Sequence, residues 1–453
     1  MNFVIRTAST AVACLLLTGS AWAADLGGDC CADLEERVAE LEATTARKGN
    51  RKVSLTVYGQ VNQAVMFWDD GTQDNMYVVN NKTSTTHFGF EGNAAINSEW
   101  SAGFRIEIEP ALANSDFVDQ GFVPGAPGAL FGGSLGVGDD GRAAMVLRHA
   151  HWYLNSKRLG RISVGMQSNA TDNIAEMDLS RTSVVSLSSV ETWNEGFFLS
   201  DANTGFTVQF PGVLALSGAG VSIMGDLFRG NLDGGRGNLV RYDSPVVAGF
   251  IFSAAWGEDD DWDVGLRYAG KAGDIRLLAG IGYHDGKIVD TDNVTFLIGA
   301  NAIPTHQEVV GSFSALHEPS GLFVTVAGGG RNWSDTPVAG VDLLGEKYFY
   351  VKSGLLRRWF SLGDTSIYGE YYKIWDVGLE FGSTLDPRFN EEAQMFGVGI
   401  VQHIDAAAME LYLAYRHYSA DDITDFTLTP GAVTLTDHDI RMDMVMGGAR
   451  IKF

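Results

Sequence analysis

This 453-residue chain has few cysteines, few prolines and no long apolar run. Cys14 lies near the amino terminus. Cys30 and Cys31 are adjacent in sequence, so they cannot link distant parts of a fold. They are either two unpaired cysteines or a cross-link between subunits. A membrane-spanning helix needs about 20 apolar residues, and the apolar stretch at 246–256 is only half that long. The sequence therefore excludes a disulfide-stapled fold and a membrane protein built from spanning helices.

Basic residues are also scarce, since 32 Lys and Arg stand against 56 Asp and Glu, giving a net charge of −24. Such an acidic chain is a poor partner for nucleic acid or anionic headgroups. Glycine and aromatic residues are plentiful, with 55 Gly, 25 Phe, 14 Tyr and 10 Trp. This composition is typical of short strands with bent corners and of interfacial aromatic girdles.

The amino-terminal residues 1–23 are predicted to be a secretory signal peptide. Arg6 supplies the positive region, residues 11–18 the apolar core, and Ala21-Trp-Ala23 a cleavage site. Residues 24–52 are then predicted to form a periplasmic segment with a short helix. Within it Leu34, Val38 and Leu41 have coiled-coil spacing, and the helix either bundles subunits or is a solvated linker.

From residue 53 onward the pattern is that of β-strands with one apolar and one polar face. At the carboxy terminus, Ile451 and Phe453 alternate with Arg450 and Lys452. Alternate residues of a strand face opposite sides of a sheet. In a lipid-embedded barrel the apolar set meets hydrocarbon and the polar set meets an aqueous lumen. An exported chain without spanning helices can cross a membrane only as a closed barrel.

Several segments resemble Gram-negative general porins, most closely those of alphaproteobacteria. Thr85-Thr-His-Phe-Gly-Phe-Glu-Gly92 is similar to their second strand. Arg148-His-Ala-His-Trp-Tyr-Leu154 and Leu159-Gly-Arg-Ile-Ser-Val-Gly165 are similar to their fourth and fifth strands, and residues 236–250 to the sixth. The resemblance covers most of the chain, and the terminal Phe453 fits it.

With these anchors, the sequence predicts an all-β fold: a closed antiparallel transmembrane barrel over residues 53–453. The sixteen expected strands lie near 53–67, 84–96, 99–110, 144–155, 160–168, 238–245, 248–257, 262–270, 274–285, 306–317, 321–330, 346–357, 364–375, 394–404, 408–418 and 437–453. Residues 169–237 are expected to be an oversized loop folded into the lumen. The alternative is an eighteen-strand barrel, with further strands at 204–210 and 220–225.

A barrel of sixteen strands encloses an aqueous channel, and charges facing each other across a narrowing loop set its ion preference. The resemblance implies an eyelet of acidic loop residues opposite basic wall residues. The loop candidates are Asp172, Glu176, Asp178, Glu191, Glu195 and Asp201, together with the base Arg181. The wall candidates are Arg105, Arg161, Arg416 and Arg450, with Arg148 of uncertain direction. Because the first strand has no inward Lys or Arg between Ser54 and Ala64, we expect a neutral to mildly cation-preferring pore.

The expected function is therefore that of a general diffusion porin, which passes ions and small hydrophilic solutes across the outer membrane of a Gram-negative cell. One alternative is a sugar-specific channel, for which Tyr348, Tyr350, Tyr368 and Tyr372 would form a lumen ladder. A barrel enzyme or a soluble adhesin fits less well. The family resemblance also implies a homotrimer, in which the loop at 111–143 contacts a neighbouring subunit.

No catalytic residue, metal site or cofactor is predicted. Gly136-Val-Gly-Asp-Asp-Gly141 matches a dinucleotide motif but lacks its helix, and His149 and His151 lack further ligands. The acidic run Glu258-Asp-Asp-Asp261 lacks calcium-loop spacing. It is expected in an extracellular loop, where divalent ions could bridge it to lipopolysaccharide.

Overall fold

The computed structural model describes residues 53–110, 113–116, 118–120, 145–205, 223–287, 305–334, 341–381, 388–429 and 432–453. The predicted signal peptide, the segment 24–52 with Cys30 and Cys31, and most of the loop 111–143 lie outside these ranges. No helix among the described residues is long and apolar enough to cross a membrane.

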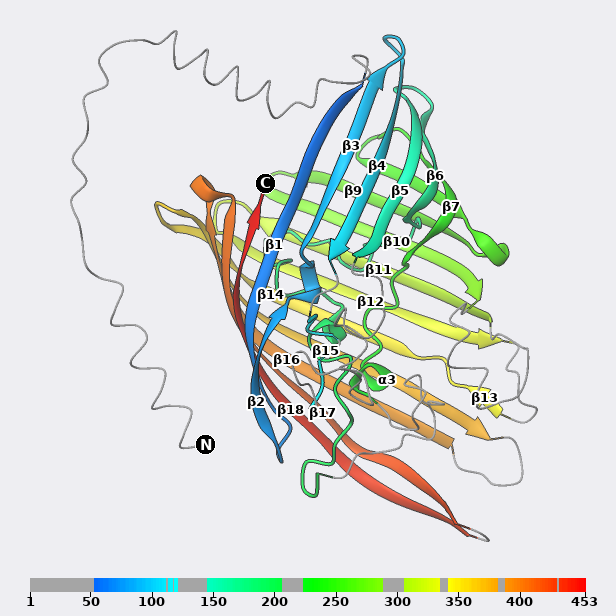
Figure 1. Ribbon diagram of the computed structural model, residues 1–453, viewed down its shortest axis with the longest axis vertical. Coiled ribbons are helices and arrows are strands. Elements are labelled where there is room, and N and C mark those ends of the chain that lie inside the picture. Colours follow the sequence, from blue (N-terminus) through cyan, green and yellow to red (C-terminus); the bar gives the residue numbers. More distant parts are fainter. Residues whose placement is uncertain are drawn as a thin grey trace, which may run out of the picture. The chain divides into compact units, whose positions relative to one another are not determined.

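Within these ranges, sixteen antiparallel strands pair in chain order and close on themselves (Figure 1). They are β1 (Ser54–Asp69), β3 (His87–Ala95), β4 (Trp100–Pro110), β5 (Met145–Ser156), β6 (Gly160–Ser168), β7 (Arg236–Asp243), β8 (Phe250–Trp256), β9 (Trp262–Ala272), β10 (Ile275–Lys287), β11 (Thr305–His317), β12 (Leu322–Ser334), β14 (Lys347–Phe360), β15 (Gly363–Phe381), β16 (Arg388–Ile404), β17 (Met409–Thr429) and β18 (Ala432–Lys452). The predicted closed barrel is confirmed.

The barrel closes where β1 pairs with β18, from Gln60 opposite Lys452 to Asp69 opposite Asp443. Beyond this ladder, Gly59 and Phe453 exchange two backbone hydrogen bonds, each of 3.0 Å. The Phe453 ring occupies the space above Gly59, where a Cβ atom would lie 2.6 Å from the ring Cζ. The terminal aromatic residue thus extends the seam by one further pair.

The eighteen-strand alternative is wrong, because β6 pairs directly with β7 from Arg161 opposite Asp243 to Ser168 opposite Arg236. The expected strand at 220–225 is also wrong where it is described, since α3 (Met224–Leu227) is a single helical turn. The expected strand at 204–210 lies largely outside the described residues.

Two additional strands were missed by the sequence analysis. β2 (Asp74–Asn80) pairs with the second half of β1, while β3 pairs with its first half, so the two share one place in the wall. The break between them includes the short 3-10 helix η2 (Lys82–Ser84). There Asn81 turns inward and donates hydrogen bonds to the Val184 carbonyl (2.9 Å) and the Tyr412 hydroxyl (3.1 Å). The other strand, β13 (Val341–Leu343), adds three residues to β15.

Side chains alternate along the wall as the sequence predicts. Phe67, Val398 and Ile451 point outward and are 52%, 55% and 46% exposed, which suits a face that meets lipid. On the same strands, Met66, Met444 and Met446 point inward and are buried. One end of the barrel has short turns such as 96–99 and 361–362, and the other has the long connections. This asymmetry is typical of barrels with short periplasmic turns and long extracellular loops.

Candidate functional site: the lumen and its inward loop

The described part of the connection between β6 and β7, residues 169–205 and 223–235, lies inside the barrel, as predicted. Its residues Ile174, Val184, Trp193 and Phe197 are almost wholly buried. They belong to one apolar cluster with inward-facing side chains of β14 to β18. In a barrel this wide, side chains that face the lumen would otherwise contact water. The loop therefore shields the inner face of β14 to β18 from water.

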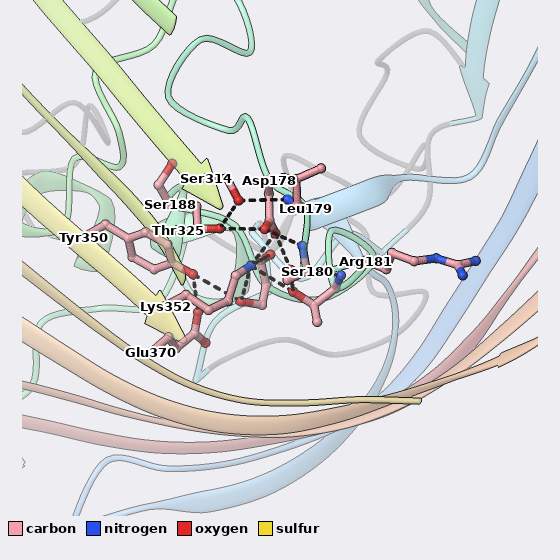
Figure 2. A network of polar contacts seen from close by, with 12 residues as sticks. Asp178, Leu179, Ser180, Arg181, Ser188, Ser314, Thr325, Tyr350, Lys352 and Glu370 are labelled. Atoms are coloured by element: carbon pink, nitrogen blue, oxygen red, sulfur yellow. Dashed lines mark hydrogen bonds and ion pairs between the residues drawn. The ribbon is translucent and has the colours of Figure 1, made fainter. Parts of the chain in front are cut away.

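A buried lysine anchors the loop to β14 (Figure 2). The Lys352 ammonium lies 2.7 Å from Asp178 Oδ2 and donates hydrogen bonds to Thr182 Oγ1 and the Ser186 carbonyl, both at 2.8 Å. Its side chain is 1% exposed. Burial acts to raise the pKa of Asp178, but Lys352 and hydrogen bonds from Ser180 outweigh it and lower that pKa. This pair fixes the middle of the loop.

Glu370 of β15 makes a second anchor beside the first. It accepts hydrogen bonds from Ser186 Oγ (2.7 Å) and from Arg416 Nε (2.8 Å). It also accepts one from Tyr350 Oη (2.8 Å), as Figure 2 shows. Arg416 also donates to the Val190 carbonyl (3.2 Å) and lies 4.6 Å above the Trp193 ring. Arg416 is therefore a fully buried loop contact.

The sequence analysis missed Lys352 and Glu370. Lys352 has the same strand parity as Tyr348 and Tyr350, so its inward direction was readable from the alternation. Its burial was not readable, because burial depends on which part of a distant loop covers it.

Glycines on β9 and β10 make room for the start of the loop. A Cβ atom on Gly265 would lie 2.6 Å from the Ala170 carbonyl oxygen and 2.8 Å from Ile174 Cδ1. A Cβ atom on Gly282 would lie 2.6 Å from Thr171 Cγ2. The loop backbone therefore approaches this part of the wall more closely than a larger residue would permit.

The opposite part of the wall, from β4 to β9, carries arginines whose side chains are only partly buried. Arg105 pairs with Glu107 and donates to Tyr58 Oη (2.7 Å), and Arg161 lies 3.8 Å above the Tyr153 ring. Arg148 faces inward and pairs with Glu107 at 2.8 Å. Arg267 donates to the carbonyls of Ala170 and Asp172, each at 2.7 Å.

Arg241 of β7 faces the same side as these arginines, whereas Arg236, at the start of β7, is exposed and has the opposite strand parity. The charges of both oppose the effect of burial on the pKa of the loop carboxyl of Asp172. Arg241 also pairs with Asp243 at 2.8 Å. Among the described residues, no carboxylate forms an ion pair with Arg161, Arg236 or Arg267. The sequence analysis did not list Arg236, Arg241 or Arg267 as pore residues, although Arg236 and Arg241 lie within the motif that carried the resemblance.

The other acidic loop candidates lie mostly beneath the loop surface. Burial raises the pKa values of Asp172, Glu176 and Glu191. Glu176 accepts a hydrogen bond from Ser189 Oγ (2.7 Å), and the nearby Glu195 carboxyl raises the pKa of Glu191 further. Burial and the nearby Asp116 carboxyl raise the pKa of Glu195 to about 7. These carboxyls are thus less readily ionised than exposed ones.

The remaining predicted site residues lie in two places. Asp201 accepts from His438 Nδ1 (3.2 Å) where the loop meets β18. Arg450 pairs with Glu410 at 2.5 Å, and Arg181 pairs with Asp364. Together with Arg276 and Lys452, Arg181 and Arg450 line a cavity of about 520 Å³ near the short-turn end of the barrel.

The four predicted lumen tyrosines are covered by the loop. Tyr348, Tyr350, Tyr368 and Tyr372 are at most 3% exposed. Tyr348 stacks on Tyr372 at 5.9 Å, and Tyr372 donates to the Gly230 carbonyl at 2.6 Å. They are positioned as a packing surface for the loop.

A closed ring of sixteen strands, with an apolar outer face and a loop folded into a polar lumen, defines a multi-pass β-barrel channel of the outer membrane. The family model described as Gram-negative porin matches residues 8–428. The chain belongs to this family, and it is a general diffusion channel of the outer membrane. Membership indicates a channel rather than an enzyme.

Solved structures show the same fold at low sequence identity. The anion-selective porin from Comamonas acidovorans is 14% identical, with a TM-score of 0.52 over 88% of this chain and 100% of its own. The outer membrane channel DcaP of Acinetobacter baumannii is 11% identical, with a TM-score of 0.50 over 90% of this chain and 100% of its own. A loop L8 deletion mutant of OmpT from Vibrio cholerae is 13% identical, with a TM-score of 0.50 over 89% and 100%. No curated protein sequence matches the chain.

Proposed function

We propose that ions and small solutes pass between the inward loop and the wall formed by β4 to β8, and that this path prefers anions weakly. The observation that carries the proposal is the set of three wall arginines without a carboxylate ion pair, Arg161, Arg236 and Arg267, in the described part of the chain. The carboxyls that face them from the loop are largely buried, and burial opposes their ionisation.

The cavity at the short-turn end of the barrel also supports a preference for anions. Four bases line it, Arg181, Arg276, Arg450 and Lys452. Its two acidic residues are paired, Asp178 with Lys352 and Glu410 with Arg450. Rings of basic side chains favour anions in pores.

This proposal departs from the expectation of a neutral to mildly cation-preferring pore. That expectation depended on the first strand, and β1 indeed contributes no inward base between Ser54 and Ala64. The arginines stand instead on later strands, where the tertiary structure gathers them opposite the loop.

The reversal potential of the purified protein in a planar bilayer, across a KCl gradient, tests the preference. We expect the sign for anions in the wild type and a shift toward cations in an Arg161→Gln/Arg236→Gln variant. Lys347→Gln is the matched control, because Lys347 is 65% exposed and pairs with Asp376 away from the lumen. A cation-preferring wild type, or a double variant with an unchanged potential, would contradict the proposal.

We also propose that the chain assembles as a homotrimer, and that the acidic turn at 258–261 meets lipopolysaccharide through divalent ions. The first proposal rests on the porin family, and native mass spectrometry in detergent tests it. A monomer at all protein concentrations would refute the trimer.

We further propose that the channel does not select one sugar, because the loop covers the four tyrosines that a ladder would need. Block of the channel current by a single sugar would oppose this.

The pore-lining role of Arg105 is part of the same proposal, and its position on the wall facing the loop supports this role. Asp172, Glu176, Glu191 and Glu195 are better suited to holding the loop in place, because they lie mostly beneath its surface. Arg416 has the same role from the wall that the loop covers.

A further inference from the structure

Two histidines and a glutamate form a buried cluster near the long-loop ends of β10 and β11. His284, His306 and Glu308 each place a possible ligand atom within 4.8 Å of the others. All three face the lumen, and their exposed fractions are 9%, 7% and 3%. The strand register brings them together, since His284 pairs with Glu308 across the ladder and His306 lies two residues before Glu308.

The distances within the cluster suit a small divalent ion. His284 Nδ1 lies 3.2 Å from Glu308 Oε2, and His306 Nε2 lies 3.6 Å from Glu308 Oε1. Ligands bound tetrahedrally to zinc at about 2.0–2.2 Å lie roughly 3.3–3.6 Å apart. Imidazole and carboxylate are ligands that zinc accepts together.

A second carboxylate approaches from the turn between β8 and β9. Asp261 Oδ1 lies 2.7 Å from His284 Nε2. It is close because β10 carries glycine at position 286, where a Cβ atom would lie 2.8 Å from His284 Nε2 and 2.9 Å from Asp261 Oδ2. Any larger residue at that position would push Asp261 and His284 apart.

His306 is the member of the cluster that protein contacts leave unsatisfied. Its Nδ1 is buried and has no hydrogen-bond partner, and its Nε2 has only the 3.6 Å approach to Glu308. Its ring packs against His284 at 5.1 Å and against Trp333 at 5.5 Å between centroids. Buried polar groups are nearly always partnered, so a histidine held in this way points to a ligand that completes it.

The surrounding charges hold Glu308 in position. Arg331 donates to Glu308 Oε1 and lies 2.9 Å from Glu346 Oε1, which leaves Glu308 Oε2 facing His284. Carboxylates Asp261, Glu308 and Glu346 outnumber the nearby bases Arg331 and Arg229, the latter 3.7 Å from Glu346. The site is thus oriented by outer contacts, as metal ligands commonly are, and it has negative charge left to offset a dication.

We propose that His284, His306 and Glu308 form a binding site for a divalent transition-metal ion of the zinc type in the outer mouth of the channel, with Asp261 holding the His284 ring through its other nitrogen. The sequence analysis predicted no metal site, because the three residues belong to two strands and are not part of any spaced motif. The acidic run containing Asp261 was read there as a loop feature alone.

Isothermal titration of the purified, detergent-solubilised protein with Zn²⁺ tests the site. We expect one zinc ion per chain, and a loss of affinity of at least about tenfold in His306→Gln and in Glu308→Gln, since even outer-shell changes cost about 10–100-fold. Titration with Co²⁺ adds a spectroscopic readout, because histidine-bound tetrahedral Co²⁺ absorbs strongly in the visible range. The wild type should show this absorption and His306→Gln should lose it.

His317→Ala is the matched control, because His317 ends the same strand, is exposed, and donates to or accepts from Ser320 at 2.6 Å. Gly286→Ala keeps every ligand and disturbs only the space between Asp261 and His284, so it should weaken binding even if the ligand variants fold poorly. Far-UV circular dichroism verifies the barrel in each variant. Equal zinc binding by the wild type and His306→Gln, or no zinc binding by the wild type, would overturn the proposal.

Discussion

Replacing Lys352 with methionine should loosen the inward loop without opening the barrel wall. The substitution keeps an unbranched side chain that is one atom shorter, and it removes the ammonium group. Lys352 provides the charge opposite Asp178 and donates hydrogen bonds to Thr182 and Ser186. The wall strands keep their backbone ladders, since β14 still pairs with β12 and β15.

The expected magnitude follows from the burial of both partners. Lys352 and Asp178 have side chains that are 1% and 4% exposed. Removing one partner of a buried ion pair typically costs about 3–5 kcal/mol, because the other charge stays desolvated. Asp178 keeps hydrogen bonds from the Ser180 amide and from Thr325 Oγ1, both at 2.8 Å, so the lower end of this range is expected. A loss of about 3 kcal/mol raises the undocked population roughly 10²-fold.

Hydrogen exchange measured by mass spectrometry reports this population directly. The amides of Leu179, Val185 and Ser186 are bonded within the loop or to the wall, so they exchange only when the loop opens. In Lys352→Met we expect their exchange to accelerate roughly 10²-fold. Single-channel recordings should show noisier and larger open currents.

Lys347→Met is the control, since Lys347 lies on the same strand, is 65% exposed and contacts no loop residue in the described pairs. Adding Asp178→Asn to Lys352→Met should restore part of the protection, because it removes the stranded charge. The reasoning would be refuted if exchange in the loop changed less than about threefold in Lys352→Met, or if the double variant were looser than the single one.

Two further predictions concern the docking of the same loop. Burial is the main cause that raises the pKa of Glu195 to about 7 and the pKa of Asp226 to about 6. Ionisation of these two groups therefore destabilises the docked loop. Docking should become more stable as the pH falls from 8 toward 5, because both groups then take up protons. Hydrogen exchange of the loop amides, corrected for its intrinsic pH dependence, measures the stability of docking at each pH. The Glu195→Gln variant should show a weaker pH dependence than the wild type. Weaker docking at pH 5 than at pH 8 would contradict the prediction. Gly265→Ala should displace the loop at a cost of about 1–3 kcal/mol, since its Cβ would lie 2.6 Å from the Ala170 carbonyl oxygen. Open-channel conductance should change in that variant but stay normal in Gly369→Ala, where the nearest atom is 3.9 Å away; equal currents in both would show that the loop does not need this close approach.

Much of the barrel was readable from local pattern. Alternation along β18 places Arg450 inward and Ile451 outward, and it does so for every long strand, because the period of a strand is set by its backbone alone. The number of wall strands was predicted from this pattern together with the resemblance to porins, and the pattern alone left eighteen strands open. β2 and β13 were missed because they are short and take their structure from pairing with β1 and β15.

The site depended on contacts that no local pattern contains. The resemblance to porins implied that residues 169–237 enter the lumen, and the strand parity of Arg105 and Tyr350 was predictable from the alternation. It did not indicate which wall the loop would cover. Lys352, Glu370 and Arg416 are buried anchors, while Arg161, Arg236 and Arg267 form no carboxylate ion pair among the described residues, and His284 meets His306 across two strands. Strand alternation is a property of neighbouring residues, whereas burial and ion pairing depend on a loop that packs against strands more than a hundred residues away.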